Sequence, residues 1–90
     1  MVMVEVLTSP RCAYCNTVKM RVNKVVEELK KQKVDVAVKE VDVLKQPEIR
    51  LKYEITSTPA LAVNGKLVYI GVPPEDVIKR IIEEAYVKRD

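Results

Sequence analysis

Residues 2–15 read VMVEVLTSPRCAYC, an apolar run followed by a break and then by both cysteines of the chain. The apolar run, residues 2–7, is typical of a strand covered on both faces. A helical pattern starts at Cys12, so the Cys-x-x-Cys lies where a strand passes into a helix. Unpaired backbone N–H groups and the dipole at a helix N-terminus favour a thiolate over a thiol. This placement makes a redox-active dithiol the leading hypothesis.

The length and composition of the chain indicate a single domain, residues 1–90, with one hydrophobic core. Of the 90 residues, 48% are hydrophobic, and a chain of this size buries about 60–70% of its extended surface on folding. The apolar residues are mostly aliphatic, with four Tyr and no Phe or Trp. This composition suits strands and helix faces packed around a central sheet.

The charge distribution and the lack of long apolar stretches argue against several classes of protein. The net charge is +3, from 16 basic and 13 acidic residues that are interleaved along the chain, which argues against nucleic acid as the partner. The N-terminal segment contains Glu5 and lacks a basic start, and no apolar stretch approaches the roughly 18 residues of a membrane span. We therefore expect a cytoplasmic protein that binds neither nucleic acid nor membrane. In the cytoplasm a lone Cys-x-x-Cys is more often catalytic or metal-binding than structural.

Hydrophobic periodicity predicts the elements that follow the cysteines. An amphipathic helix of about five turns comes first. Its apolar face comprises Val18, Val22, Val25, Val26 and Leu29. A second strand is expected between residues 34 and 42, with a change of phase at Lys39-Glu40. Because proline at the first helical position loses no hydrogen bond, Pro47 marks the start of a short helix that runs to about Tyr53.

A hairpin and a helix complete the chain. Asn64-Gly65 separates the short apolar runs 60–63 and 66–70, which is a strong local signal for a two-stranded hairpin. Pro73 and Pro74 precede a final helix. Its apolar face comprises Val77, Ile78, Ile81, Ile82 and Ala85. The order strand, helix, strand, helix, strand, strand, helix predicts an α/β protein with a mixed sheet and a right-handed first crossover.

Three features coincide in this arrangement: residues 9–15, SPRCAYC, at a strand-helix junction, Thr58-Pro59 before the third strand, and Asn64-Gly65-Lys66 in the hairpin. With these features the chain resembles the thioredoxin/glutaredoxin superfamily, and more narrowly the small glutaredoxin-like thioredoxins found mostly in archaea. The resemblance covers nearly the whole chain. It implies a thioredoxin-like fold of order β-α-β-α-β-β-α, in which three helices flank a four-stranded mixed sheet.

The resemblance also implies a substrate site around the dithiol. In the family the peptide bond before the residue equivalent to Pro59 is cis, which leaves the backbone of Thr58 free to pair with an extended substrate strand. Without the resemblance, an ordinary trans turn proline would be the favoured interpretation. Three further residues are candidate substrate contacts, each with a plain structural role as the alternative: Arg11, Tyr14 and Gly71.

Three departures from the family patterns bear on the chemistry. Cys-Ala-Tyr-Cys is close to the glutaredoxin Cys-Pro-Tyr-Cys pattern and far from the Trp-Cys-Gly-Pro-Cys pattern of thioredoxins. The glutathione-binding Gly-Gly of glutaredoxins is replaced by Gly71-Val72-Pro73-Pro74, which argues against glutathione. Val6 occupies the position at which thioredoxins carry a buried acid that helps proton transfer, and the chain has no histidine to take that role. The chain therefore combines a glutaredoxin-like dithiol with a thioredoxin-like scaffold.

The function that these residues predict is thiol-disulfide exchange on protein disulfides. A Cys12 thiolate attacks a substrate disulfide to form a mixed disulfide, which Cys15 resolves. We expect the helix N-terminus to lower the pKa of Cys12 but not that of Cys15. Arg11 and Lys19 are nearby cations that would act in the same direction, each with a plain solvated surface charge as the alternative. We expect no cofactor and no metal. The expected partners are disulfide-containing proteins and an upstream reductase similar to thioredoxin reductase, and the chain is expected to act as a monomer.

Three alternatives remain open on the sequence alone. Cys12 and Cys15 could form a structural staple, which would contribute roughly 2 kcal/mol because it closes so short a loop. They could hold zinc or share an iron-sulfur cluster, but two cysteines supply half of a tetrahedral site, so a second subunit or outside thiols would be needed. The chain could also be a glutathione-dependent glutaredoxin that reduces glutathione mixed disulfides.

Overall fold

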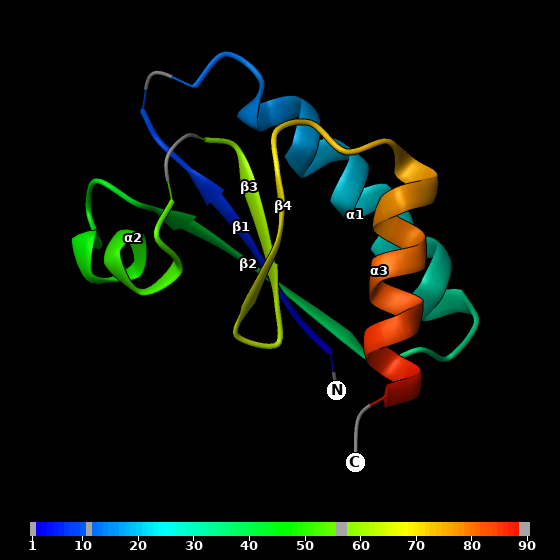
Figure 1. The fold of residues 1–90 in the computed structure, drawn as a ribbon. Helices are drawn as coiled ribbons and strands as arrows, with labels where there is room; N and C mark the ends of the chain where they lie inside the picture. The colour runs from blue at the N-terminus through cyan, green and yellow to red at the C-terminus, as the bar shows by residue number, and fades with distance from the viewer. Residues whose placement is uncertain (1, 11, 56–57, 89–90) are drawn as a thin grey trace.

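The computed structural model describes residues 2–10, 12–55 and 58–88. These residues form four strands and three helices in the predicted order (Figure 1). The elements are β1 (Val2–Thr8), α1 (Cys15–Lys31), β2 (Val36–Asp42), α2 (Pro47–Tyr53), β3 (Ala60–Val63), β4 (Lys66–Ile70) and α3 (Glu75–Lys88). None of the helices described is long and apolar enough to cross a membrane. The fold class predicted from the sequence is confirmed.

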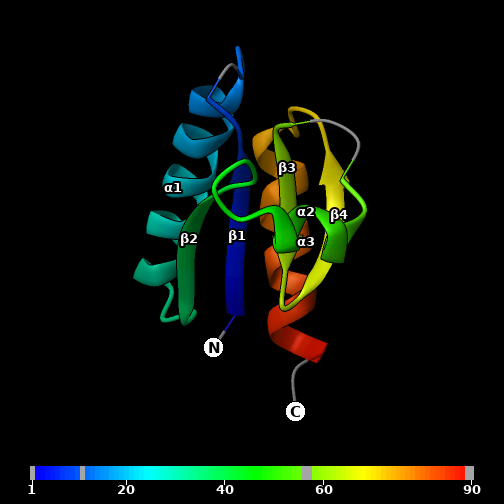
Figure 2. The same ribbon diagram turned by 90° about the vertical axis from the view of Figure 1, so that its left-hand side faces the viewer.

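The strands form one mixed sheet in the order β2-β1-β3-β4 (Figure 2). β1 pairs in parallel with β2 and antiparallel with β3, and β3 pairs antiparallel with β4. In the β1–β3 pair, Leu7 lies opposite Ala60. The topology therefore brings the segment that follows β1, which carries the cysteines, next to the segment that precedes β3.

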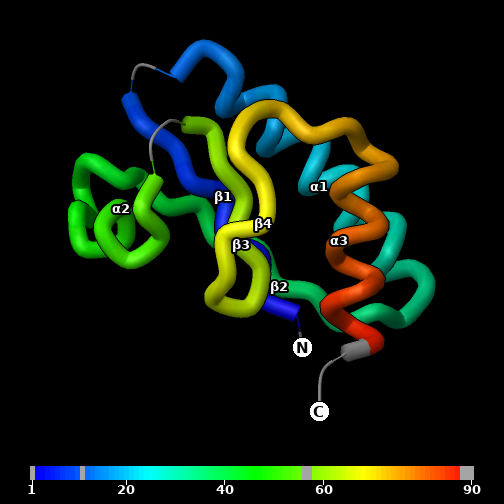
Figure 3. Tube along the Cα trace, viewed as in Figure 1, coloured from blue at the N-terminus to red at the C-terminus, as the bar shows by residue number. Residues whose placement is uncertain are grey.

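Hydrophobic residues form a core on each face of the sheet (Figures 1 and 3). α1 and α3 cover one face, and α2 covers the other. The larger core, beneath α1 and α3, includes Val2, Val4, Val6, Val18, Val22, Leu29, Ile78 and Ile82. The smaller core, beneath α2, comprises Leu7, Val41, Val43, Tyr53, Ile55, Ala60 and Ala62. β1 is therefore covered on both faces, as its apolar sequence predicts.

The change of phase in the second strand follows from these two cores. Val36 is buried in the larger core, whereas Val41 and Val43 are buried in the smaller core. Successive side chains of a strand point to opposite faces of the sheet, so an apolar pattern that shifts by one residue moves to the other face. Lys39 and Glu40 lie between the two apolar positions and are exposed on this edge strand.

The first helix begins later than the sequence pattern predicts. α1 starts at Cys15 rather than at Cys12, because Tyr14 has non-helical backbone angles, φ −114° and ψ 4°. The Val18 N–H donates a hydrogen bond to the Tyr14 carbonyl oxygen at 3.2 Å. Cys12 lies in the preceding loop, where its N–H donates to the Ser9 carbonyl oxygen at 3.3 Å. The loop therefore places Cys12 outside the helix and Cys15 in its first turn.

The other predicted boundaries are confirmed, with one shift. Pro47 opens α2 as expected. Asn64 and Gly65 both have positive φ, at 51° and 82°, as the tightest hairpin turns require. The second strand begins at Val36 rather than at residue 34, because the chain turns at Lys33, which has a φ of 65°.

Candidate active site

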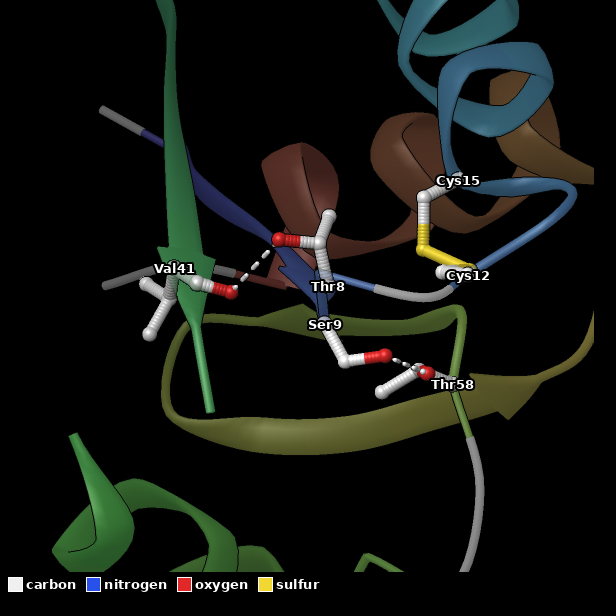
Figure 4. The surroundings of a disulfide bond; sticks show 6 residues. All are labelled: Thr8, Ser9, Cys12, Cys15, Val41 and Thr58. Atoms are coloured by element: carbon white, nitrogen blue, oxygen red, sulfur yellow. Dashed lines mark hydrogen bonds between the residues drawn. A yellow bond between two sulfur atoms is a disulfide. The ribbon is translucent and has the colours of Figure 1, made fainter. Parts of the chain in front are cut away.

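A disulfide bond joins Cys12 to Cys15 at the end of the sheet where β1 leads into α1 (Figure 4). The sulfur atoms are 2.04 Å apart and the Cα atoms 5.5 Å apart. Cys15 is 6% exposed, whereas Cys12 is partly exposed in the loop before the helix. Cys12 is therefore the more accessible of the two residues to a reactant from solution.

The start of α1 provides a positive electrostatic environment for the dithiol. The N–H groups of a first helical turn have no acceptors within the helix, and the helix dipole places a partial positive charge there. The first turn of α1 contains no acidic residue, and the N-cap residue Tyr14 makes no capping hydrogen bond with its side chain. A helix start of this kind generally favours a thiolate over a thiol.

Thr58 and Pro59 lie beside the segment that carries Cys12. The Thr58–Pro59 peptide bond is cis, as the family resemblance implies, and Pro59 is buried while Thr58 is half-buried. The Ser9 hydroxyl oxygen lies 2.8 Å from the Thr58 hydroxyl oxygen (Figure 4). The same Ser9 accepts the hydrogen bond from the Cys12 N–H. Ser9 and Thr58 are 49 positions apart in the sequence, so the fold connects the loop of the dithiol to a distant segment of the chain.

Gly71 contacts this segment from the end of β4. Its N–H donates to the Pro59 carbonyl oxygen at 2.8 Å. Gly71 has a φ of 110°, a conformation that residues with a side chain rarely adopt. A Cβ atom at this position would meet the Tyr69 ring at an ordinary 3.9 Å. The backbone conformation, rather than the available space, therefore requires glycine beside Pro59.

The other residues predicted to surround the dithiol have different environments. Tyr14 is 62% exposed between the two cysteines. Arg11 lies outside the described residues. Lys19 Nζ lies 3.1 Å from Glu40 Oε2 on β2, so an acid partly neutralises the charge that was expected to act on Cys12.

The position of the family's buried acid is apolar in this structure. Val6 is fully buried in the larger core. The neighbouring Glu5 is engaged on the α2 face, where its Oε1 accepts a hydrogen bond from the Tyr53 hydroxyl at 2.7 Å. Burial, followed by this hydrogen bond and the Glu5 charge, raises the pKa of Tyr53 to about 12. This pair attaches α2 to the sheet and supplies no acid at the Val6 position.

Two side-chain hydrogen bonds near the site have no local signature in the sequence. One joins Ser9 to Thr58. In the other, Arg21 Nη1 on α1 donates to the Pro73 carbonyl oxygen at 3.0 Å, which ties the segment after Gly71 to the helix. The first bond joins residues 49 positions apart and the second joins residues 52 positions apart, so both bonds can be identified only in the folded chain.

The cysteines have no further metal ligands around them in the part of the chain that the structure describes. No group of three or more His, Cys, Asp or Glu side chains there could hold a metal ion. Two cysteines supply half of a tetrahedral zinc site. The zinc or iron-sulfur alternative therefore needs ligands from another molecule.

Known proteins match this chain over most of its length. The thioredoxin domain family matches residues 2–83. The thioredoxin of Methanocaldococcus jannaschii is 31% identical over 84 residues, which cover 92% of this chain and 94% of that protein. A probable thioredoxin of Archaeoglobus fulgidus is 34% identical over 84 residues, which cover 93% of this chain and 89% of that protein.

Solved structures show the same relationship. A protein disulfide oxidoreductase from Aeropyrum pernix superposes with a TM-score of 0.79 and 30% identity, covering 98% of this chain and 38% of that chain. A mutant thioredoxin from Halobacterium salinarum superposes with a TM-score of 0.71 and 27% identity, covering 99% of this chain and 77% of that chain. The dithiol described above lies within the matched region. The chain belongs to the thioredoxin domain family and is a dithiol-disulfide oxidoreductase.

Proposed function

We propose that Cys12 is the attacking cysteine of this oxidoreductase and Cys15 the resolving cysteine. In the reduced chain, the Cys12 thiolate attacks one sulfur of a substrate disulfide, and the other substrate sulfur leaves as a thiolate that takes up a proton. Cys15 then attacks the Cys12 sulfur of the mixed disulfide and releases the second substrate thiol. Two electrons pass to the substrate, and the Cys12–Cys15 disulfide forms again.

The difference in exposure between the two cysteines is the observation that carries this proposal. Cys15 is 6% exposed in the first turn of α1, whereas Cys12 is partly exposed in the loop. A bulky protein disulfide must reach the attacking sulfur from outside, which favours Cys12. The resolving sulfur needs to reach only Cys12, to which it is bonded in the oxidised chain.

We infer that a substrate polypeptide pairs with Thr58 in an extended conformation. Thr58 precedes β3, which begins at Ala60, and pairing through the backbone gives affinity with little demand on side chains. This mode of binding suits an enzyme that acts on disulfides in different proteins. The exposed Tyr14, together with Arg11 and Gly71, is proposed to contact the same substrate strand.

We infer further that an enzyme similar to thioredoxin reductase returns electrons to the dithiol. The glycine pair of glutaredoxins is replaced by Gly71-Val72-Pro73-Pro74. Proline has no backbone N–H, so this segment offers fewer donors to the carboxylates of glutathione. The similarity to archaeal thioredoxins supports the same electron source. We propose that the chain works as a monomer in the cytoplasm, where cellular reductants keep cysteines reduced and can regenerate the dithiol after each turnover.

A coupled assay separates the two electron sources, with insulin as the disulfide substrate. The chain is supplied either with NADPH and an archaeal thioredoxin reductase or with NADPH, glutathione and glutathione reductase. We expect insulin reduction with the first system and little with the second. Insulin reduction only with the glutathione system would favour the glutaredoxin alternative. The Ala-Tyr pair between the cysteines, which is close to the glutaredoxin pattern, suits that alternative.

Dithiothreitol provides the control for the exchange activity itself. With this reductant the chain should accelerate insulin reduction, and the Cys12→Ser variant should not. If the unaltered chain does not accelerate the reaction, the proposed function is wrong, whichever enzyme supplies the electrons.

A further inference from the structure

Ser9 connects the loop of the attacking cysteine to the proposed substrate-binding segment. Its hydroxyl oxygen lies 2.8 Å from the Thr58 hydroxyl oxygen, and either group can donate. Its carbonyl oxygen accepts the Cys12 N–H at 3.3 Å. One half-buried residue therefore contacts both the backbone that carries the nucleophile and the residue proposed to hold the substrate, the second contact being the one drawn in Figure 4.

The sheet by itself does not set the orientation of Thr58. The strand begins only at Ala60, and the Gly71 N–H binds the carbonyl oxygen of Pro59 rather than that of Thr58. A residue before proline favours extended backbone, in which the side chain points roughly at right angles to the backbone hydrogen-bonding groups. A hydrogen bond that holds the Thr58 hydroxyl therefore also sets where its backbone N–H and carbonyl point.

We propose that Ser9 is a positioning residue that sets the distance between the Cys12 sulfur and a substrate strand paired with Thr58. The inference rests on the proposed function and assigns Ser9 no part in the sulfur exchange itself. Attack requires the reacting atoms to lie about 3–3.5 Å apart in the correct alignment. If the substrate strand shifts relative to Cys12, attack on its disulfide slows although the thiolate is unchanged. Small disulfides that reach the Cys12 sulfur directly do not depend on this alignment.

The test compares two disulfides in the Ser9→Ala variant: a peptide disulfide with its cysteine in an extended segment, and the small aromatic disulfide dithionitrobenzoate. We expect kcat/KM for the peptide to fall about fivefold, the change typical of losing one intramolecular hydrogen bond. The rate with dithionitrobenzoate should stay the same. Ser9→Thr retains a hydroxyl and should recover most of the peptide activity.

A double-mutant cycle with Thr58→Val tests whether the two hydroxyls act as one unit. Thr58→Val keeps the branched shape of the side chain, and it should lower peptide turnover about as much as Ser9→Ala does. The double variant should lose no more than either single variant. If Ser9→Ala folds poorly, the Thr58→Val single variant still tests the contact, because it should slow the peptide disulfide and leave the rate with dithionitrobenzoate unchanged; equal effects on both disulfides would overturn the inference.

The outcomes separate this inference from the proposed function. If Ser9→Ala slows both disulfides equally, or slows neither, the positioning role is wrong while the exchange activity stands. Losses that multiply in the double variant show that the hydroxyls act independently, which also overturns the inference. If the unaltered chain reduces neither disulfide, the proposed function itself is overturned.

Discussion

The contact between Tyr53 and Glu5 attaches α2 to the sheet, and its loss at alkaline pH should make the fold less stable there. Tyr53 is 7% exposed, and its hydroxyl donates to Glu5 Oε1 at 2.7 Å. Burial, then this hydrogen bond and the Glu5 charge, raises the pKa of Tyr53 from 10.0 to about 12. Because the folded chain holds this proton more tightly than the unfolded chain, the contribution is complete below the unfolded pKa. It is lost as the pH rises through the folded value.

The size of this contribution follows from the two pKa values. They differ by about two pH units, and each unit corresponds to about 1.36 kcal/mol. Solvent around the part-buried hydrogen bond screens this interaction, so the bound proton contributes on the order of 1–2 kcal/mol to the free energy of unfolding. Tyr53→Phe removes the hydroxyl and should lower that free energy by about 1–3 kcal/mol at neutral pH, as expected for a hydrogen bond to a charged group.

Urea unfolding of the oxidised protein at a series of pH values measures this effect. The difference in stability between the unaltered chain and Tyr53→Phe should shrink by about 1–2 kcal/mol as the pH rises from about 9 to about 12. Val43→Ala is the matched control, because Val43 is 4% exposed in the same core and carries no titrating group. Its difference from the unaltered chain should stay constant. A Tyr53→Phe difference that also stays constant over this range would show that the Tyr53 proton does not contribute to stability.

Three further predictions concern the dithiol and the core. In the reduced chain, Cys12 should react with iodoacetamide well below about pH 8.5, where an ordinary thiol is still largely protonated, whereas Cys15 should not; equal reactivity would contradict this. Lys19→Met should leave the pH dependence of that reaction unchanged, because Glu40 already pairs with Lys19; a clear shift to higher pH would show that Lys19 activates Cys12. Leu29→Ala should lower the free energy of unfolding by about 2–5 kcal/mol in urea, because Leu29 is fully buried in the larger core; a loss below about 1 kcal/mol would contradict that packing.

The elements with strong periodicity could be predicted from the sequence because their burial follows the local geometry. The apolar face of α1 is buried as expected from helical spacing, and the Asn64-Gly65 turn has the positive φ values expected of it. The start of α1 could not be located in this way. Cys12 and Tyr14 form a loop after Pro10, and a short loop has no period that distinguishes it from a first helical turn.

The geometry around the dithiol depends on contacts between distant residues. The residues around Pro59 taken alone favour a trans bond, and only the family resemblance points to the observed cis bond. The hydrogen bond between Ser9 and Thr58 spans 49 positions and forms because β1 and β3 are neighbours in the sheet. Lys19 is close in sequence to Cys12, but its ion pair is with Glu40 on β2, a contact that its sequence neighbours do not indicate.

Trapping of the mixed disulfide tests most directly whether Cys12 attacks and Cys15 resolves. Reduced Cys15→Ser is mixed with a disulfide-bonded peptide, and the products are separated without reductant and identified by mass. Cys15→Ser should form a covalent adduct through Cys12 that dithiothreitol releases, and Cys12→Ser should form no stable adduct. An adduct that accumulates with Cys12→Ser, or no adduct with Cys15→Ser, would show that Cys12 is not the attacking cysteine.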